Sequence, residues 1–375
     1  MADFSPHRSW RIVHSEASLG WGGQEHRILA ELQGFRRRGH NVWLLAPPYS
    51  QIFQHAQADG IACEPADFTR WKFPYEALRI TRWLRRIRPH VVNPHSSRDA
   101  WLVGVVARLA RTPLIIRSRH IDVTYPNAWI SRHVFTTFAD HVLTTSDKIT
   151  GHLRARFALP AEHITTVPTG IDLLRFSPRV TPVALPRLGG EPHWPTVGMV
   201  SVLRSWKGHA TFFAAARRLR EQGRQINFVV VGGGAPLEAY QAMARGAGAD
   251  FVAFAGHRED VPGVLRALSL LAIPSTHHEG IPQIGLQALA CETPVIGSDC
   301  GGIPEVIRPG QTGRIFRAGD VAALAECVAE ALDEPGETRR LAAGGRQFVE
   351  DRHGLDVMLD QVEEIYRRYL PARQA

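Results

Sequence analysis

Short apolar runs alternate with longer amphipathic stretches along the chain. In the first half, five runs have the length of a buried strand, at residues 11–15, 41–47, 91–95, 113–118 and 141–146. The stretches between them are predicted to be helices, at about residues 24–38, 75–88, 99–110 and 147–158. This alternation predicts a parallel sheet that is covered by helices on both faces.

A second series of the same kind follows a break at residues 177–195, where five prolines occur without periodicity and predict a linker. Its strands are expected at residues 196–203, 226–232, 251–256, 269–275, 293–299 and 313–316, followed by helices at about 319–333, 336–351 and 355–369. We therefore predict an N-terminal domain over 1–176, a C-terminal domain over 196–353, and a helix within 354–375 that packs back on the first domain. The fold class is α/β, with two doubly wound, Rossmann-like domains that face an interdomain cleft at the carboxyl ends of their sheets, where such folds bind ligands.

Composition narrows the class of protein. The 375 residues suffice for two domains, and 44% apolar with 21% charged residues is typical of soluble globular proteins. No apolar run approaches the roughly 20 residues of a membrane span, and the first residues carry no signal-peptide pattern. The four cysteines form no CxxC, which argues against a zinc knuckle or a disulfide scaffold. Together these features predict a cytoplasmic protein.

The net charge of +8 lies in the first half, since residues 1–180 hold 24 Lys and Arg against 14 Asp and Glu. It is densest over Arg70–Arg88, where cations are interleaved with the aromatic residues Trp71, Phe73, Tyr75 and Trp83. A basic, aromatic amphipathic stretch fits an anionic membrane surface, and a solvated helix face is the alternative. No nucleic-acid motif accompanies the stretch, so we expect no nucleic-acid partner.

One lysine lies in a conspicuous motif, although the chain has only three lysines beside 41 arginines. Arg204 and Lys207 directly follow the predicted strand at 196–203, where a helix is expected to begin. Two cations three residues apart at the carboxyl end of a strand can clamp a diphosphate, Arg through its planar fork and Lys as a point charge. Two surface cations near the start of a helix are the alternative.

The segment Glu279–Gln287 follows another predicted strand. Pro282 suits the first turn of a helix, and the amides of Gln283 and Ile284 then face the helix N-terminus, where an anion is favoured. Glu279 can accept hydrogen bonds from sugar hydroxyls, and Gln287 lies two turns into the helix. The alternative for Glu279 is a capping carboxylate on a core helix.

Glycines follow two other predicted strands. Gly232–Gly234 is a partial dinucleotide fingerprint, because Leu237 stands where the third glycine belongs, and this argues against a nicotinamide dehydrogenase. Gly22 and Gly23 form a strand-to-helix turn in which a phosphate or a sugar can approach the backbone.

Two histidines, His95 and His120, end predicted strands of the first domain and are expected to face the cleft. A structural role in the core is the alternative. Neither has metal-ligand spacing with another histidine, and no Asp-x-Asp pair occurs in the chain. We therefore expect no metal and no cofactor.

These motifs together resemble the retaining glycosyltransferases of family 4, which have the GT-B fold. The family's Glu-x7-Glu motif is matched by Glu279–Gln287. Further segments of this chain resemble family signatures at residues 92–97, 117–120, 169–172, 203–208, 256–261 and 297–306. Gln287 departs from the family, because it stands in place of the second Glu, which binds the nucleotide ribose. Val202 stands where an Arg is usual, and we infer that Arg204 takes that role from a shifted position.

The resemblance implies roles for single residues. Lys207 and Arg204 would hold the donor diphosphate, and Glu279 would bind hydroxyls of the donor sugar. His120 would lie beside the transferred sugar. The remaining donor-binding residues would be Gly22, Gly23, Gly256, His257, Arg258, Gln283, Ile284 and Gln287, and the acceptor side would include His95, Ser96 and Arg119.

We therefore predict a metal-independent glycosyltransferase that uses a nucleotide-diphosphate sugar, with retention, in cell-envelope polysaccharide or lipopolysaccharide synthesis. The acceptor would be a glycan or a lipid-linked molecule. The enzyme would bind peripherally to the inner face of the membrane, with Arg70–Arg88 as the contact. In the mechanism that the family implies, the departing phosphate takes the acceptor proton. Two alternatives remain: a nucleotide-sugar epimerase of the same fold, and a non-catalytic subunit that binds a nucleotide sugar, suggested by Gln287.

Overall fold

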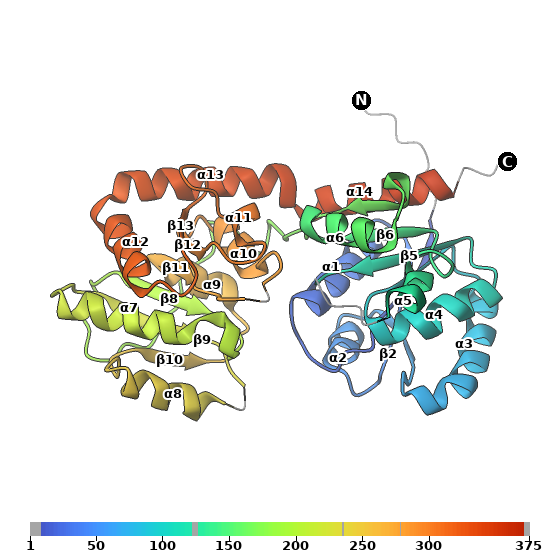
Figure 1. Ribbon diagram of the computed structural model, residues 1–375, viewed down its shortest axis with the longest axis horizontal. Coiled ribbons are helices and arrows are strands. Elements are labelled where there is room, and N and C mark those ends of the chain that lie inside the picture. Colours follow the sequence, from blue (N-terminus) through green and yellow to red (C-terminus); the bar gives the residue numbers. More distant parts are fainter. Residues whose placement is uncertain (1–8, 122–126, 235, 278, 371–375) are drawn as a thin grey trace. The chain divides into compact units, whose positions relative to one another are not determined.

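The computed structural model describes residues 9–121, 127–234, 236–277 and 279–370. The chain divides into two compact units, one comprising residues up to Gly170 together with those from Leu355 onward, and the other spanning Ile171–Gly354. Each unit is built on one sheet with helices on both faces (Figure 1). In the described part of the chain, we find no helix with both the length and the apolar character that crossing a membrane requires.

The first unit contains a seven-stranded sheet in the order β3-β2-β1-β4-β5-β6-β7, with every neighbouring pair parallel. Its strands are β1 (Arg11–Ser15), β2 (Asn41–Ala46), β3 (Ala62–Pro65), β4 (Val91–Pro94), β5 (Leu114–Arg119), β6 (His141–Thr144) and β7 (Ile164–Thr166). The order reverses between β1 and β4, so this is the position at which a doubly wound sheet binds its ligand.

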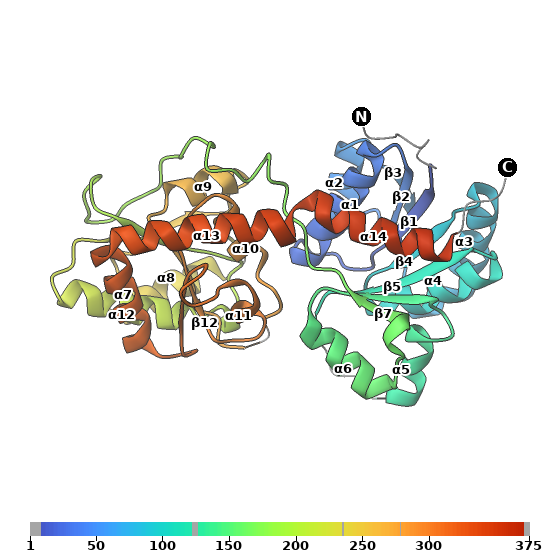
Figure 2. The ribbon, with the colours of Figure 1, turned by 90° about the horizontal axis from the view of Figure 1, so that it is seen from above.

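Helices cover both faces of this sheet. They are α1 (Gly23–Arg37), α2 (Gln51–Ala58), α3 (Phe73–Ile87), α4 (Ser97–Leu109), α5 (Ala128–Phe135), α6 (Asp147–Phe157) and α14 (Leu355–Tyr369), with 3-10 turns η1 (Arg70–Lys72) and η2 (Ala161–His163). On one face, α1, α2 and α14 share a core with alternate residues of β1 and β2, and α3 and α4 cover the other face. Figure 2 shows α14 alongside α1.

The second unit contains a six-stranded parallel sheet in the order β10-β9-β8-β11-β12-β13. Its strands are β8 (Thr196–Val200), β9 (Asn227–Val231), β10 (Ala253–Gly256), β11 (Leu270–Ile273), β12 (Val295–Ser298) and β13 (Arg314–Phe316). The strand order reverses between β8 and β11, which marks the corresponding ligand position in this sheet.

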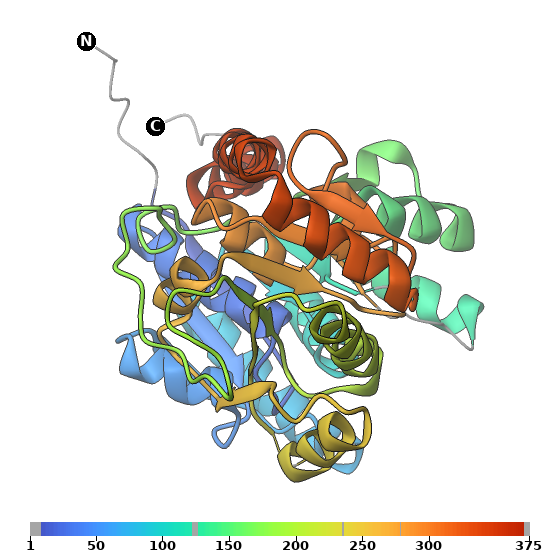
Figure 3. The same ribbon diagram turned by 90° about the vertical axis from the view of Figure 1, so that its left-hand side faces the viewer.

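The helices of the second unit also lie on both faces of its sheet. They are η3 (Ser205–Lys207), α7 (His209–Glu221), α8 (Leu237–Gly246), α9 (Val261–Ala267), α10 (Gln283–Ala290), α11 (Ile303–Val306), α12 (Val321–Asp333) and α13 (Pro335–His353). One face is packed by α7, α8 and α12, and the other by α9, α10, α11 and α13. The neighbouring helices α7 and α12 can be followed in Figure 3.

The chain passes between the units earlier than the proline-rich segment suggests. We expected the first domain to extend to residue 176 and a linker to follow over 177–195. Ile171 and Phe176 are instead buried in the core of the second unit, and Val183 donates a backbone hydrogen bond to Gly263 (3.2 Å). The return passage lies between Gly354 and Leu355, and residues 371–375 of the expected C-terminal helix lie outside the described residues.

The packing of α14 on α1 generates a stability prediction. A Cβ at Gly34 of α1 would overlap the side chain of Leu359, so the two helices approach closely there, and Leu359 is 1% exposed. We expect Leu359→Ala to lower the free energy of unfolding by about 2–5 kcal/mol, because it leaves a cavity. The matched control is Leu174→Ala, at a leucine that is 93% exposed. Equal denaturant midpoints for the two variants would contradict this packing.

Candidate functional site

In the second unit, the loop after β8 packs directly on the loop after β11. Gly208 has a φ of +78°, and a Cβ there would overlap the carbonyl oxygen of Pro274, so only glycine fits this approach. The amide of Thr276 donates to the carbonyl of Trp206 (2.8 Å). These contacts hold Lys207, the last residue of η3, next to the end of β11.

Lys207 and Glu279 form the central ion pair of this region. The Lys207 Nζ lies 2.8 Å from both carboxylate oxygens of Glu279, and the two side chains are 20% and 8% exposed. The amide of Gly302 donates to the Glu279 carbonyl (3.3 Å), and a Cβ at Gly301 would overlap that same oxygen. The glycine turn after β12 therefore fixes the backbone of Glu279.

This pairing argues against the capping interpretation of Glu279. Helix α10 begins at Gln283 with Pro282 at its N-cap, and no side chain caps it. Glu279 is therefore not a capping carboxylate; its charge is directed at Lys207. Because Pro282 precedes the helix, the amides of Gln283 and Ile284 belong to the first turn of α10. Gln287 lies one turn further along α10 and is half-buried.

The other donor-side residues lie at the neighbouring strand ends. Arg204 is exposed, and its guanidinium lies 5.7 Å from the centre of the Trp206 ring. Gly256 ends β10, and its carbonyl accepts from the amide of Gly232 after β9 (2.8 Å). His257 follows and is exposed. Arg258 donates from Nε to Asp260 (2.7 Å), so its charge is already paired. The structure thus gathers these residues at the carboxyl ends of β8, β9, β10 and β11.

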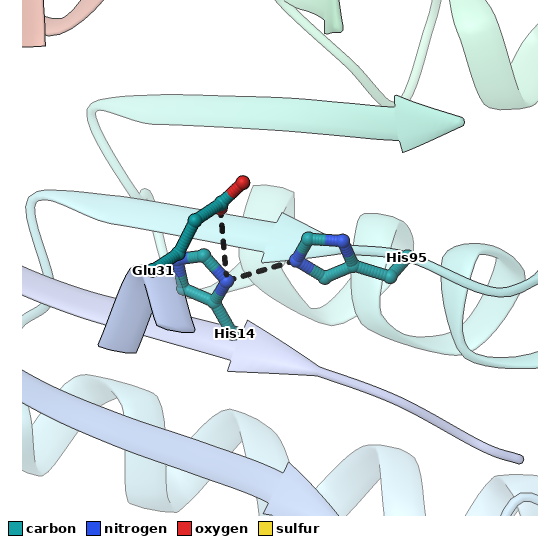
Figure 4. Close-up of side chains that lie close together, drawn as sticks. All are labelled: His14, Glu31 and His95. Atoms are coloured by element: carbon teal, nitrogen blue, oxygen red, sulfur yellow. Dashed lines mark hydrogen bonds and ion pairs between the residues drawn. The ribbon is translucent and has the colours of Figure 1, made fainter. Parts of the chain in front are cut away.

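In the first unit, the two predicted histidines meet a third, His14 of β1. His95 Nε2 lies 2.8 Å from His14 Nδ1, and His95 Nδ1 lies 2.8 Å from His120 Nε2 (Figure 4 shows His14, His95 and Glu31). His14 and His95 are 0% exposed and His120 is 8% exposed. His95, which we expected to face the cleft, is instead fully buried between His14 and His120.

Two buried carboxylates lie beside these histidines. Asp99 accepts hydrogen bonds from the Ser15 hydroxyl (2.7 Å), the His95 amide (3.0 Å) and the Ser96 hydroxyl (2.7 Å). Glu16, which follows β1, accepts from the amide of Ser18 (2.7 Å) and from the side chain of Gln24. Burial, together with the smaller effect of the Asp99 charge, raises the pKa of Glu16 to about 8; burial also raises the pKa of Asp99.

The other residues of the first unit that we expected to bind donor or acceptor begin helices or lie in hydrogen-bonding contact with a neighbouring side chain. Gly22 is the N-cap of α1 and donates its amide to Glu25 (2.9 Å), while Gly23 is the first residue of that helix. Arg119 is buried, and its Nη1 lies 3.4 Å from the Ser97 hydroxyl. Ser96 is the N-cap of α4. These residues share the carboxyl edge of the sheet with His120.

Sequence reasoning missed four side chains at this edge: His14, Glu16, Glu31 and Asp99. His14 lies inside an apolar run, where a lone polar residue in a buried strand is the signal that could have found it. Asp99 and Glu31 lie in predicted helices, and acidic residues there are usually solvated.

Known protein families match this chain in two parts, one mainly in each unit. Residues 21–175 match a family model described as Glycosyltransferase Family 4, and residues 194–334 match one described as Glycosyl transferases group 1. A GDP-mannose-dependent alpha-(1-6)-phosphatidylinositol monomannoside mannosyltransferase of Mycolicibacterium smegmatis is 28% identical, over 76% of this chain and 80% of that protein. A 2-deoxystreptamine glucosyltransferase of Streptomyces kanamyceticus is 27% identical, over 71% and 67% of the respective chains.

Solved structures show the same fold. A glycosyltransferase from Rickettsia africae superposes with a TM-score of 0.86 at 17% identity, over 97% of this chain and 100% of that one. Anabaena HepE in complex with UDP and glucose superposes with a TM-score of 0.78 at 18% identity, over 95% and 99%. The chain belongs to the GT-B glycosyltransferases. The expected α/β fold class with two doubly wound, Rossmann-like domains is confirmed.

The buried Glu16 of this glycosyltransferase generates a pH prediction. Its pKa is raised to about 8 from an ordinary value of 4.5, so the folded state keeps a proton that the unfolded state releases between these values. Stability contributed by this group therefore falls as the pH rises through that window. We expect the unfolding free energy of the wild type to fall more between about pH 5 and pH 8 than that of Glu16→Gln.

The control for this comparison is Glu259→Gln, which removes the same charge at an exposed position of the second unit. Denaturant titrations at the two pH values measure the difference. A Glu16→Gln variant with the same pH dependence as the wild type would show that Glu16 is ionised in the folded protein.

Proposed function

We propose that this glycosyltransferase transfers a sugar from a nucleotide-diphosphate sugar, with retention, to a glycan or lipid-linked acceptor of the cell envelope. The ion pair of Lys207 and Glu279 at the strand-order reversal of the second sheet carries the proposal. The names of the matched proteins support the donor class: HepE was solved with UDP-glucose, and the mycobacterial relative is GDP-mannose-dependent.

The pair is suited to a donor that carries a diphosphate next to a sugar. A lysine ammonium has three hydrogen-bond donors, and Glu279 takes up two of them at 2.8 Å. The third can reach a phosphate oxygen while the carboxylate accepts from sugar hydroxyls. Arg204, exposed on the same loop, supplies a second cation. Both cations would stabilise the charge that develops on the departing nucleotide.

The other proposed roles belong to residues in the first turn of α10, at the neighbouring strand ends, and in the first unit. The amides of Gln283 and Ile284 would face the diphosphate, since a helix N-terminus favours anions. Gly256, His257 and Arg258 would hold the base, and Gln287 would bond the ribose without supplying charge. Gly22 and Gly23 would let the donor approach the first unit. His120 would contact the transferred sugar, with Ser96 and Arg119 on the acceptor side.

In the proposed mechanism, the departing phosphate takes the proton of the acceptor hydroxyl. No protein side chain then acts as a general base. The chain contains no Asp-x-Asp pair for a divalent metal, so Lys207 and Arg204 would carry the charge stabilisation that a metal otherwise supplies. We propose that transfer is metal-independent.

Replacement of the lysine tests the proposal. We expect Lys207→Ala to abolish sugar transfer, because it removes the diphosphate ligand and leaves the Glu279 carboxylate facing the donor phosphates. Lys148→Ala is the matched control, since Lys148 is exposed on α6. Product analysis of purified protein with a panel of nucleotide sugars and envelope acceptors measures transfer. Near-normal turnover by Lys207→Ala would refute the diphosphate role.

The same analysis separates the alternative functions. An epimerase would convert the donor when no acceptor is present. A non-catalytic subunit would bind the donor, which a thermal shift detects. The wild-type protein would then neither transfer the sugar nor slowly hydrolyse the donor.

We further propose that α3 and η1 place the enzyme peripherally at the inner face of the membrane. Exposed residues recur at helical spacing along this segment: Trp71, Tyr75, Leu78, Arg82, Arg85 and Arg86. Trp83 does not belong to this face, because it is 6% exposed and packs in the core. Lys72 and Arg79 pair with acidic residues of this chain, and Arg82 and Arg86 are exposed near the end of α3.

Vesicle binding tests this orientation. We expect the double variant Arg82→Ala/Arg86→Ala to bind anionic phosphatidylglycerol vesicles roughly thirtyfold more weakly, since each cation contributes about 1 kcal/mol near such a surface. The control Arg217→Ala/Arg218→Ala changes the charge equally on α7 of the second unit, at exposed positions. Equal cosedimentation of the two variants would exclude α3 as the membrane contact.

A further inference from the structure

Three imidazoles form a continuous hydrogen-bonded row at the carboxyl edge of the first sheet. His14 lies in β1, His95 follows β4 and His120 follows β5, and both ring-to-ring nitrogen distances are 2.8 Å. The rings are stacked, with centroids 4.9 Å and 5.1 Å apart. Only His120 has exposed surface, so the row has one buried end and one end toward the outside.

A carboxylate lies beside His14, the buried histidine that ends the row. Glu31 of α1 places Oε2 3.8 Å from His14 Nδ1, as drawn in Figure 4. Its other oxygen accepts from Arg27 Nε (2.7 Å), and Arg27 is itself tied to the Val167 carbonyl (2.8 Å). Glu31 and Arg27 are 1% and 3% exposed, so this charge pair is a fixed part of the core.

Each neutral imidazole carries one proton, so the row has only two possible directions. In one direction, His14 Nδ1–H donates to His95 Nε2, His95 Nδ1–H donates to His120 Nε2, and His120 keeps its proton on Nδ1. In the other direction, His120 Nε2–H donates to His95 Nδ1 and His95 Nε2–H donates to His14 Nδ1. His14 then carries its proton on Nε2.

Two observations favour the first direction. His14 Nε2 is buried and has no hydrogen-bond partner among the described residues, so a proton there would be an unsatisfied buried donor. His14 Nδ1 is also the nitrogen that faces Glu31 Oε2. A proton on Nδ1 is attracted to this carboxylate, whereas a lone pair on Nδ1 would be repelled by it.

The surroundings also keep the row uncharged. Burial lowers the pKa of His14 to about 4, and burial lowers the pKa values of His95 and His120 well below the ordinary value. Arg27 and Arg117 lower the pKa values of His95 and His120 further, and Arg119 acts on His120 in the same direction. Glu31 alone raises the pKa of His14, which is not enough to offset burial.

We propose that His14 and His95, oriented by Glu31, are positioning residues that hold His120 as the neutral tautomer with its proton on Nδ1. The row thereby turns His120 into a hydrogen-bond donor toward an oxygen atom of the substrate. The use of this donor rests on the proposed function, in which His120 contacts the transferred sugar; the tautomer itself does not.

A metal ion fits this cluster less well than hydrogen bonds do. Glu31, His14 and His95 offer three ligand atoms within 4.8 Å of one another. Two nitrogens that share a tetrahedral zinc ion at about 2.0–2.1 Å would lie roughly 3.3 Å apart, whereas these lie at 2.8 Å. The Arg27 guanidinium on Glu31 also opposes a further cation in this buried position.

The experiment is long-range nitrogen–proton NMR of histidine-labelled protein, recorded without donor or acceptor from about pH 6 to pH 8. His120 is assigned by comparison with His120→Gln. We expect its Nδ1 to have the shift of a protonated nitrogen and its Nε2 that of an unprotonated one throughout this range. An Nε2-protonated or positively charged His120 in the wild type would overturn the proposal, as would a spectrum that changes on adding Zn²⁺ to chelator-treated protein.

A pair of substitutions at His14 separates positioning from simple packing. Asparagine places an amide N–H near the position of Nδ1, so His14→Asn keeps the donor to His95, and His14→Leu removes it. We expect His14→Leu to shift His120 toward the Nε2-protonated form and His14→Asn to restore the wild-type pattern. His141→Gln, at a buried histidine of the same unit that bonds Thr165 instead, should leave His120 unchanged.

Activity is the second readout. We expect His14→Leu to lower kcat/KM for transfer about tenfold, the size of one lost hydrogen bond, and His14→Asn to recover it. Identical His120 spectra for His14→Leu and His14→Asn would overturn the proposal. Where His14→Leu does not fold, the wild-type spectrum decides alone. If the spectra are as expected but the wild-type protein transfers no sugar, the tautomer is established and the proposed function is refuted.

Discussion

Parallel strands all end at the same edge of their sheet, and this constraint gathers the chemically active side chains of each unit. In both sheets the strand order reverses, between β1 and β4 in one and between β8 and β11 in the other. The connections on either side of the reversal leave toward opposite faces of the sheet, so they do not cover the strand ends between them. Lys207 and Glu279 follow β8 and β11, and Glu16 and His95 follow β1 and β4. The fold thus positions these groups before any specific interaction forms.

The sequence predicted all strands of the second sheet and the inner strands of the first, and it missed the two edge strands of the first sheet for a physical reason. The strands β2 and β9 lie inside their sheets and show nearly continuous apolar runs, as buried parallel strands must. The missed strands β3 and β7 are the two edges of the first sheet; they are short and only partly buried. The missed α2 and α5 have eight residues each, too few for a helical period to stand out.

At the candidate site, too, the sequence indicated single residues but not the contacts between them. Arg204, Lys207 and Glu279 could be recognised separately, because each follows an apolar run that ends at the carboxyl edge of a sheet. The bond between Lys207 and Glu279 joins residues 72 positions apart, and no local pattern encodes it. His14 and Glu31 were missed for a related reason: one lies in a strand that has the composition of core, and the other lies on a helix. Only the packing of α1 on β1 brings them together.

The two units handle buried charge in opposite ways, and the difference bears on how each can meet a ligand. The second unit pairs a cation with an anion near the surface, and Lys207 has a third N–H for an anionic ligand beyond the two that Glu279 accepts. At its row of histidines and at Glu16 the first unit instead suppresses charge, while the neighbouring Arg27 and Glu31 are buried as a pair. Burial favours a protonated Glu16 and uncharged histidines, and the buried Arg117 is held by the carbonyls of Pro94 and Ser118. Burial in the first place, and the charge of Arg117 in addition, disfavour an imidazolium at His95 and at His120. The strand ends of the first unit thus hold uncharged, hydrogen-bonded histidines, and those of the second hold an ion pair.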